Sequence, residues 1–202
     1  MATEPDADAD LMLRVRDGDV LAFEMLVEKY KQPVTGLVYR IILDASEAED
    51  LAQNVFLQAY KSAATYQARA RFSTWLFTIA RNLCLNELRR RSRHRTESLE
   101  QFAPDSEDAV ERPLPDTKTP LPSDDALHSE LEQKIAQSMA ELPEQQRTAI
   151  LLCRRDDLSY EDIAKILGLS LSATKSTIYR GRETLKEKLK PYLKTGEWKT
   201  SK

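Results

Sequence analysis

Glycine, cysteine and histidine are scarce in this sequence, and each shortage excludes a class of structure or chemistry. Only five of the 202 residues are glycine, which argues against a glycine-rich phosphate loop and against an all-β fold with its frequent turn glycines. The two cysteines, Cys84 and Cys153, and the two histidines, His94 and His128, lack the spacing of a zinc finger. We therefore expect neither a metal ion nor a cofactor.

Long hydrophobic runs are also missing. No stretch approaches the ~18 apolar residues of a membrane span, and the acidic start MATEPDADAD lacks the apolar segment of a signal peptide. Apolar residues nevertheless make up 41% of the chain, which is enough to build a core, while 31% of the residues are charged. We expect a cytoplasmic protein with no segment inserted in the membrane.

Charge is unevenly distributed along the chain, although the formal net charge is only −3. Residues 69–95 carry a net charge of +7 and residues 171–202 carry +6, whereas residues 96–130 between them carry −8. A single basic block is usually a solvated face, but two blocks at the ends of predicted domains favour nucleic-acid binding.

The acidic stretch also marks a domain boundary. Five of the nine prolines fall within residues 96–123, where missing backbone donors and repelling carboxylates disfavour a packed core. We predict an all-α protein made of two small helical domains, residues 1–95 and 124–202. A flexible acidic linker, residues 96–123, joins them.

Apolar residues recur at spacings of three and four between residues 22 and 59, which predicts three helices. Asp19 is a candidate N-cap for the first, Pro33 suits the first turn of the second, and Ser46 with Glu49 forms a capping box for the third. The third helix carries a second stripe on the side away from its core face: Asp50, Gln53, Asn54, Leu57 and Lys61. Such a stripe is usually just hydrated, but one that includes an exposed leucine can dock a partner protein.

The segment from Tyr66 to Arg95 predicts a helix capped by Ser73, with Leu76 and Leu83 on its core face. Arginines and aromatic residues alternate on and around the other side. This combination fits single-stranded nucleic acid, because guanidinium groups contact phosphates while flat rings stack on unpaired bases. The alternative is that the aromatic rings all lie in the core: Tyr66, Phe72, Trp75 and Phe77.

The C-terminal part has the pattern of a helix-turn-helix motif. Helices are predicted to begin at Ser123, at Pro143 and, through a capping box of Ser159 with Asp162, before Ile163. Gly168 is placed as a left-handed C-cap, and a basic helix follows from residue 171 to about residue 190. That helix would present Ser172, Ala173, Lys175 and Ser176 to base edges, with Thr177, Arg180 and Arg182 nearer to phosphates.

Taken in order, four stretches resemble an extracytoplasmic-function (ECF) sigma factor of the sigma-70 family, close to the sigma-E type. They are AFEMLVEKYKQPV (22–34), EAEDLAQNVFLQAY (47–60), FSTWLFTIARNLCLNELRRR (72–91), and LPEQQRTAILL with LSYEDIAKILGLSLSATKSTIYRGRETL (142–152, 158–185). The resemblance implies a sigma region 2 domain, a linker that threads through the polymerase, and a region 4 domain. It further implies binding to core RNA polymerase, recognition of double-stranded and melted promoter DNA, and control by an anti-sigma factor, in many members anchored in the membrane.

Carried over by position, the resemblance assigns three sets of residues. The polymerase-docking helix matches Glu49, Asp50, Gln53, Asn54 and Leu57. Recognition and melting of the downstream (−10) element match Tyr66, Arg69, Arg71, Phe72, Trp75, Asn82, Asn86 and Arg89. Recognition of the upstream (−35) element matches the face of the C-terminal helix described above. The chain departs from the usual family residues at Asn54, Thr174, Thr177 and Gly181.

Two other classes of protein fit the sequence less well. A regulator that binds DNA without polymerase would need a ligand-binding or phosphoacceptor domain, but the N-terminal part shows no alternation of strands and helices. An enzyme would need a convergent set of nucleophile, base or metal ligands, and we find none in the sequence.

Overall fold

The computed structural model describes residues 6–101 and 124–195, with side chains described for residues 6–94 and 131–192. Within these ranges the chain is helical and has no strand, which confirms the predicted all-α class. The helices are α1 (Ala7–Arg16), α2 (Val20–Ile42), α3 (Ala45–Lys61), the 3-10 turn η1 (Ala63–Thr65), α4 (Phe72–Gln101), α5 (Asp124–Ala140), α6 (Glu144–Cys153), α7 (Tyr160–Leu167) and α8 (Leu171–Thr195).

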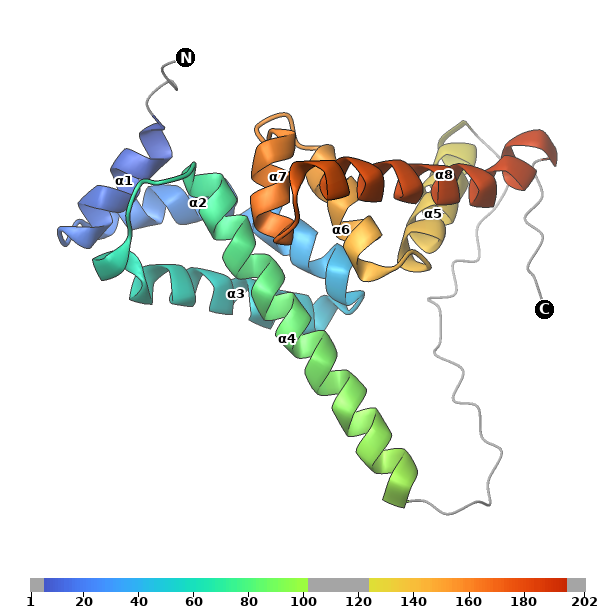
Figure 1. Ribbon diagram of the computed structural model, residues 1–202, viewed down its shortest axis with the longest axis horizontal. Coiled ribbons are helices and arrows are strands. Elements are labelled where there is room, and N and C mark those ends of the chain that lie inside the picture. Colours follow the sequence, from blue (N-terminus) through green and yellow to red (C-terminus); the bar gives the residue numbers. More distant parts are fainter. Residues whose placement is uncertain (1–5, 102–123, 196–202) are drawn as a thin grey trace.

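The helices form the two predicted helical units, which we call the N-terminal lobe (α1–α4) and the C-terminal lobe (α5–α8) (Figure 1). In the first, α2 packs between α1 and α3, and α4 crosses them; in the second, α6 and α7 pack against the long α8. Helix α4 runs past Arg95 to Gln101, so the predicted linker begins inside a helix. Most of that linker, residues 102–123, lies outside the described residues.

Helix α1 was not predicted. Its N-cap is Asp6, whose Oδ1 accepts a hydrogen bond from the Asp8 backbone N at 3.2 Å. Met12 is fully buried and Val15 nearly so, and both pack into the core of the N-terminal lobe. The signal in the sequence was an aspartate followed by apolar residues at helical spacing, but it was short and embedded in an acidic start.

Helix α2 is one continuous helix where two were expected. Asp19 caps it as predicted, with Oδ1 accepting from the Ala22 backbone N at 3.1 Å. Pro33 lies inside the helix rather than at the start of a second one. The buried residues before the proline, Leu26 and Tyr30, continue in phase with Val34 and the residues after it, so a single apolar stripe faces the core.

Helix α3 begins two residues earlier than the proposed capping box would place it. The N-cap is Asp44, whose side chain accepts from the Glu47 backbone N at 3.1 Å, and Ser46 lies inside the first turn. Ala48, Ala52, Val55 and Ala59 form the buried stripe of α3, and Leu51 packs half-buried against it.

Two of the three capping signals of the C-terminal lobe are confirmed, and the third, Ser123, lies outside the described residues. Pro143 is the N-cap of α6, and Ser159 and Asp162 form a reciprocal capping box at the start of α7. Hydrogen bonds from Ser159 lower the pKa of the Asp162 carboxyl, although burial opposes the shift. Gly168 ends α7 in the left-handed region at φ 64°, and α8 follows after two residues, which gives the helix-turn-helix geometry.

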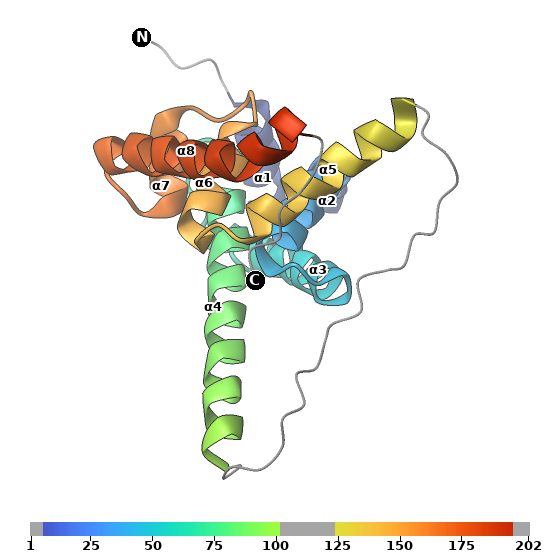
Figure 2. The ribbon, with the colours of Figure 1, turned by 90° about the vertical axis from the view of Figure 1, so that its right-hand side faces the viewer.

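The two lobes pack directly against each other (Figures 1 and 2). Helix α4 contacts α7, and α2 contacts α6. Arg147 of α6 is largely buried and donates from Nη2 to the Ile41 carbonyl oxygen of α2 at 3.1 Å. Burial lowers the pKa of this guanidinium, which the Glu144 carboxylate partly offsets. The structure is therefore a compact arrangement in which a polar contact lies between the lobes.

Candidate protein and nucleic-acid interfaces

The outer face of α3 is exposed along its length. The five residues predicted to dock a partner are all exposed: Glu49, Asp50, Gln53, Asn54 and Leu57. Leu57 leaves half of its surface in solvent, so a partner protein that covered it would gain the burial of an apolar side chain. Tyr60, one turn further on, is 47% exposed and stacks at a tilt on Phe23 of α2 with ring centroids 5.0 Å apart. Sequence reasoning missed Tyr60 as part of this face, although it lies three residues after Leu57.

Ion pairs join α3 to α4, and they involve two neighbouring arginines of α4, Arg90 and Arg91. Arg90 lies 2.7 Å from Glu87 of its own helix and 3.3 Å from Glu47 of α3. Arg91 pairs with the same two carboxylates. The hydrogen bond and charge of Glu87 raise the pKa of Arg90. These two arginines therefore stabilise the helix pair, and Arg89 next to them in the sequence is exposed.

Two of the residues assigned to the downstream element are core residues in this structure. Tyr66 and Phe72 are 4% and 1% exposed, which contradicts their predicted place on a DNA-binding surface and agrees with the alternative of core aromatic rings. Tyr66 meets the Trp75 ring edge-on with centroids 5.0 Å apart, and Phe72 packs against Tyr30 at 5.3 Å. The rings bury each other, so only Trp75, which is half-buried, still reaches the surface.

The hydroxyl of Tyr66 is buried and has no hydrogen-bond partner. Burial, followed by the charges of Asp6, Asp10 and Asp8, raises its pKa to about 12. An unpaired buried hydroxyl destabilises a fold, so the position of Tyr66 is set by its ring and not by its polar group.

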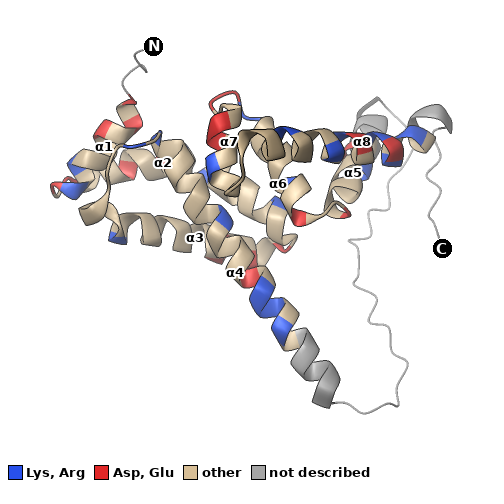
Figure 3. Cartoon of the chain, viewed as in Figure 1, with Lys and Arg blue, Asp and Glu red and all other residues tan. Residues whose placement is uncertain are grey.

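The remaining residues assigned to the downstream element lie on the surface. Asn82, Asn86 and Arg89 are exposed on one face of α4, and Arg69 and Arg71 are exposed in the loop before it. The basic half of α4 is prominent in Figure 3. This face offers carboxamides for base edges and guanidinium groups for phosphates.

The start of α4 is fixed by an aspartate distant in sequence. The Phe72 backbone N donates to Oδ2 of Asp6 at 2.6 Å, whereas Ser73, the predicted cap, is 5% exposed within the first turn. A carboxylate at a helix N-terminus is stabilised by the helix dipole. Asp6 therefore joins α1 to the loop that carries Arg69 and Arg71.

Helix α8 presents the predicted recognition face with one exception. Ser172, Lys175, Ser176, Arg180 and Arg182 are exposed, and Ala173 is half-buried. Thr177 is only 4% exposed, so its predicted place near phosphates is wrong for this structure. The reason is its phase, because Thr177 shares the inward face with Thr174 and Ile178.

One residue of the recognition face was missed. Tyr179 is 66% exposed and follows Ser172, Lys175 and Ser176 at spacings of three and four. That spacing was available in the sequence. Beside this face, Arg182 donates from Nη2 to the Cys153 sulfur at 3.2 Å, which ties α8 to the end of α6.

Two further features bear on the class of site. Among the residues the structure describes, no group of histidine, cysteine, aspartate and glutamate side chains could hold a metal ion. The helices in the described ranges include none that is both long and apolar enough to cross a membrane.

Known proteins resemble the chain over both lobes. The family model Sigma-70 region 2 matches residues 26–94, and Sigma-70, region 4 matches residues 132–185. The RNA polymerase sigma-H factor of Pseudomonas aeruginosa is 36% identical over 190 residues, covering 94% of this chain and 97% of that protein. The ECF RNA polymerase sigma-E factor of Haemophilus influenzae is also 36% identical, over 92% of this chain and 97% of that protein.

Among solved structures, the sigma factor RpoE of Bartonella quintana in complex with the anti-sigma factor NepR has a TM-score of 0.64 and 25% sequence identity. The match covers 88% of this chain and all of that one. The similarity therefore extends to the arrangement of helices in both lobes.

Proposed function

The chain belongs to the sigma-70 family of RNA polymerase sigma factors, in its extracytoplasmic-function group, and on this basis we propose how its surfaces divide the work of starting transcription. It is an alternative sigma factor, which binds core RNA polymerase and directs it to promoters, and it is not an enzyme. We propose that residues 1–95 act as region 2 and residues 124–202 as region 4, with residues 96–123 as the connector. Its place of action is the cytoplasm, where the polymerase is.

The exposed face of α3 docks the polymerase. The observation that carries this proposal is the half-exposed Leu57 aligned with Asp50 and Gln53 on a helix whose opposite face is fully used by the core. An apolar anchor surrounded by polar groups is the usual composition of a protein interface. The expected contact is with the clamp helices of the largest polymerase subunit, as the family resemblance implies.

The exposed face of α4 and the preceding loop hold the melted downstream element. Arg69, Arg71 and Arg89 supply charge for the phosphates of the separated strand, and Asn82 and Asn86 supply hydrogen-bonding groups for unpaired bases. Trp75 offers a ring edge at the surface. Tyr66 and Phe72 act indirectly, by packing against Trp75 and fixing the loop.

The exposed face of α8 reads the upstream element as duplex. Lys175, Ser176 and Tyr179 point outward from the first turns of the recognition helix, which is the part that enters the major groove in helix-turn-helix proteins. Arg180 lies further along and contacts phosphates. The basic residues of 171–202 would thus bind duplex DNA, whereas those of 69–95 would bind the separated strand.

An anti-sigma factor is the expected regulator, as in the Bartonella quintana complex. A groove of about 520 Å³ between the end of α2 and helices α5 and α6 is available for it. Tyr39 and Leu43, each nearly half exposed, line one wall, and Ile135, Met139 and Leu151 line the other. Occupation of this groove would fix the two lobes together.

The deciding experiment reconstitutes the chain with core polymerase and performs run-off transcription on genomic DNA. A sigma factor co-purifies with core polymerase and yields transcripts whose start sites share two upstream sequence elements. A regulator that acts without polymerase docking would fail to co-purify and would change transcription only when another sigma factor is supplied.

A further inference from the structure

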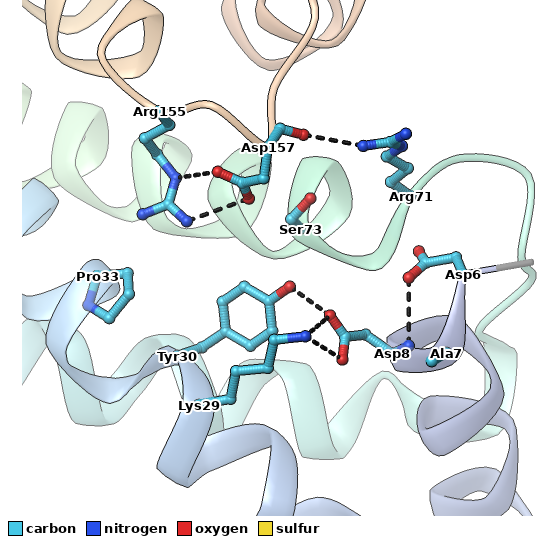
Figure 4. Close-up of a pocket in the computed structure, with 10 residues that line it drawn as sticks. All are labelled: Asp6, Ala7, Asp8, Lys29, Tyr30, Pro33, Arg71, Ser73, Arg155 and Asp157. Atoms are coloured by element: carbon cyan, nitrogen blue, oxygen red, sulfur yellow. Dashed lines mark hydrogen bonds and ion pairs between the residues drawn. The ribbon is translucent and has the colours of Figure 1, made fainter. Parts of the chain in front are cut away.

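The first turn of α1 is fastened to the body of the N-terminal lobe by a buried carboxylate. Asp8 is 8% exposed and accepts hydrogen bonds from Lys29 Nζ at 2.6 and 2.7 Å and from the Tyr30 hydroxyl at 2.6 Å. Figure 4 shows the Asp8 side chain directed at both partners, which belong to α2. Several short hydrogen bonds to one carboxylate, with a charged amine among the donors, give this end of α1 a fixed position.

Fixed in this way, α1 contacts the chain on both sides of the loop that carries Arg69 and Arg71. Before the loop, α1 packs against η1. After the loop, Asp6 accepts a hydrogen bond at 2.6 Å from the backbone N of Phe72, the first residue of α4. The six residues between these two contacts, 66–71, are therefore held at both ends by the same helix.

Helix α4 depends on this distant carboxylate because the residue at its own capping position cannot serve. That residue is Arg71, and an arginine side chain has no hydrogen-bond acceptor. Asp6 is also the N-cap of α1, since its other oxygen accepts from the Asp8 backbone N at 3.2 Å. One carboxylate thus caps two helices, and the positive N-terminal ends of both helix dipoles favour its charge.

We propose that Asp6 is a positioning residue for promoter opening, which holds Arg69, Arg71 and the Trp75 ring in the arrangement that receives the separated strand. This rests on the proposed role of that surface in binding the melted downstream element. The Trp75 backbone N donates to the Arg71 carbonyl oxygen at 3.2 Å, so both residues belong to the first turn of α4. Fraying of this turn would move them together and leave Asn82, two turns further on, in place.

Order in the loop matters for the affinity of the surface. A loop that samples several conformations binds a strand with an affinity reduced by the fraction of molecules in the binding conformation. Removal of a helix cap shifts such an equilibrium several-fold. Asp6 therefore favours DNA binding without contacting DNA. It does so against the sign of its own charge, because a carboxylate near Arg69 and Arg71 repels phosphate groups.

This opposition of sign provides the test. Asp6→Ser keeps an N-cap for α1, because serine and aspartate cap helices about equally well, but one short hydroxyl cannot also serve the Phe72 backbone N. The matched control is Asp10→Asn, one turn further along α1. Asp10 is exposed and lines a cleft of about 660 Å³ together with Arg69 and Arg71, so the control removes the same charge from the same neighbourhood.

Each variant is assembled with core polymerase and mixed with a fluorescein-labelled single strand, taken from the non-template strand of a promoter mapped by run-off transcription. We expect the Asp6→Ser holoenzyme to bind this strand about three- to tenfold more weakly than wild type. It should also open the duplex promoter less, as measured by permanganate reactivity. The Asp10→Asn holoenzyme should bind the strand equally well or more tightly, and both variants should bind core polymerase with wild-type affinity.

Amide hydrogen exchange of the free chain measures the cap itself. In Asp6→Ser, peptides covering residues 66–75 should exchange faster than in wild type, while those covering residues 79–89 should not change. A global loss of stability would instead speed exchange in both segments. If Asp6→Ser is poorly folded by circular dichroism, Asp6→Asn takes its place with the same expected results, because it offers one acceptor oxygen where aspartate offers two.

Two results would overturn the proposal. The first is strand binding by a folded Asp6 variant that equals or exceeds that of wild type. The second is equal weakening by Asp10→Asn, because the lost charge and not the lost cap would then be responsible.

Arginine variants separate these failures from a failure of the proposed function. When Arg69→Ala and Arg71→Ala holoenzymes bind the strand weakly but a folded Asp6→Ser holoenzyme binds it like wild type, the arginines hold the strand and the positioning role is wrong. When both arginine variants bind the strand like wild type, the assigned function of the loop is wrong, and the positioning proposal fails with it.

Discussion

Gly181 of α8 lies so close to Ile150 of α6 that a β-carbon at Gly181 would stand 2.8 Å from the Ile150 Cδ1 atom. The same β-carbon would be 3.3 Å from Cβ of Gln146. The absence of a side chain therefore sets how closely the recognition helix approaches α6. Glycine is a poor helix former, and the close packing of α8 on α6 compensates for that cost at this position.

We predict that Gly181→Ala lowers stability despite better helix propensity. The gain in propensity is about 1 kcal/mol, whereas inserting a methyl group into a packed interior costs about 1–3 kcal/mol. In an Ile150→Val background the clashing Cδ1 atom is gone, so the same substitution should become stabilising. Urea unfolding of the four chains in this double-mutant cycle measures the coupling, and strict additivity would contradict the contact.

Substitution of the α3 face should abolish holoenzyme formation without unfolding the chain. Asp50→Arg with Gln53→Ala alters two exposed positions, so the free energy of unfolding should change by no more than about 0.5 kcal/mol. Co-purification with core polymerase measures docking. Glu24→Arg, a charge reversal on the exposed face of α2, is the control and should bind core normally; retention of wild-type affinity by the α3 variant would refute the assignment.

Two buried tyrosines should make stability fall at alkaline pH. Burial raises the pKa of Tyr66 to about 12 and, with the hydrogen bond to Asp8, raises that of Tyr30 even further. A raised pKa means that the folded state favours the neutral tyrosine. The contribution of each buried tyrosine to the free energy of unfolding is therefore complete below the unfolded pKa of about 10 and is lost as the pH rises from there towards the folded pKa. Each group lowers the free energy of unfolding by at most about 1.4 kcal/mol per pH unit there.

The phenylalanine variants distinguish the two tyrosines. The Tyr30 hydroxyl donates to Oδ2 of Asp8 at 2.6 Å, whereas the Tyr66 hydroxyl has no partner. Tyr30→Phe should therefore destabilise the chain at pH 7 by about 1–3 kcal/mol, and Tyr66→Phe should be neutral or stabilising. Thermal melts at pH 7 and pH 11 provide the comparison; equal losses in the two variants would count against the unpaired hydroxyl.

Helix caps formed by residues close in sequence were predicted correctly. Contacts between residues far apart in sequence were not predicted. The Ser159–Asp162 capping box and the Gly168 C-cap involve neighbouring residues, so composition and spacing suffice to predict them. The cap of α4 is Asp6, which no local pattern connects to Phe72. The burial of Tyr66 depends on Trp75 and on Tyr30 through Phe72, so the sequence left both a core and a surface reading open.

The faces of the candidate interfaces were predictable to the extent that helical phase determines them. Asp50, Gln53 and Leu57 on α3 are exposed as predicted because the small core residues of that helix lie in one clear stripe. On α8 the inward stripe is broader and includes threonines, so Thr177 was placed outward although it is buried. A β-branched polar residue fits either environment, and the packing of the neighbouring helices on α8 decides between them.

Upstream recognition should depend on α8 in two separable ways. Arg180→Ala should weaken duplex binding for all sequences alike and reduce the salt dependence by about one unit of log–log slope, because one phosphate contact is lost. Lys175→Ala and Tyr179→Ala should weaken binding mainly to the upstream element. Footprinting with the holoenzyme measures both, and Lys186→Ala, further along the same helix, serves as the control with a normal footprint.

Promoter melting gives the final prediction, which rests on Asn82→Ala and Arg71→Ala. Both side chains are exposed, so neither substitution should unfold the lobe, in contrast to truncation of the half-buried Trp75. Loss of one contact worth about 1.4 kcal/mol or more reduces the population of open complexes about tenfold or more. We expect both holoenzymes to assemble normally and to show weak permanganate reactivity of promoter thymines on duplex DNA.

A template with a pre-formed bubble removes the cost of separating the strands, so both variants should recover part of their activity there. Recovery distinguishes a melting defect from a defect in upstream binding, because the upstream duplex is the same on both templates. Arg71→Ala has a second effect that Asn82→Ala lacks, since it also removes the contact with the Asp157 carbonyl oxygen. Equal opening of duplex DNA by wild type and both variants would return this face to an ordinary solvated surface.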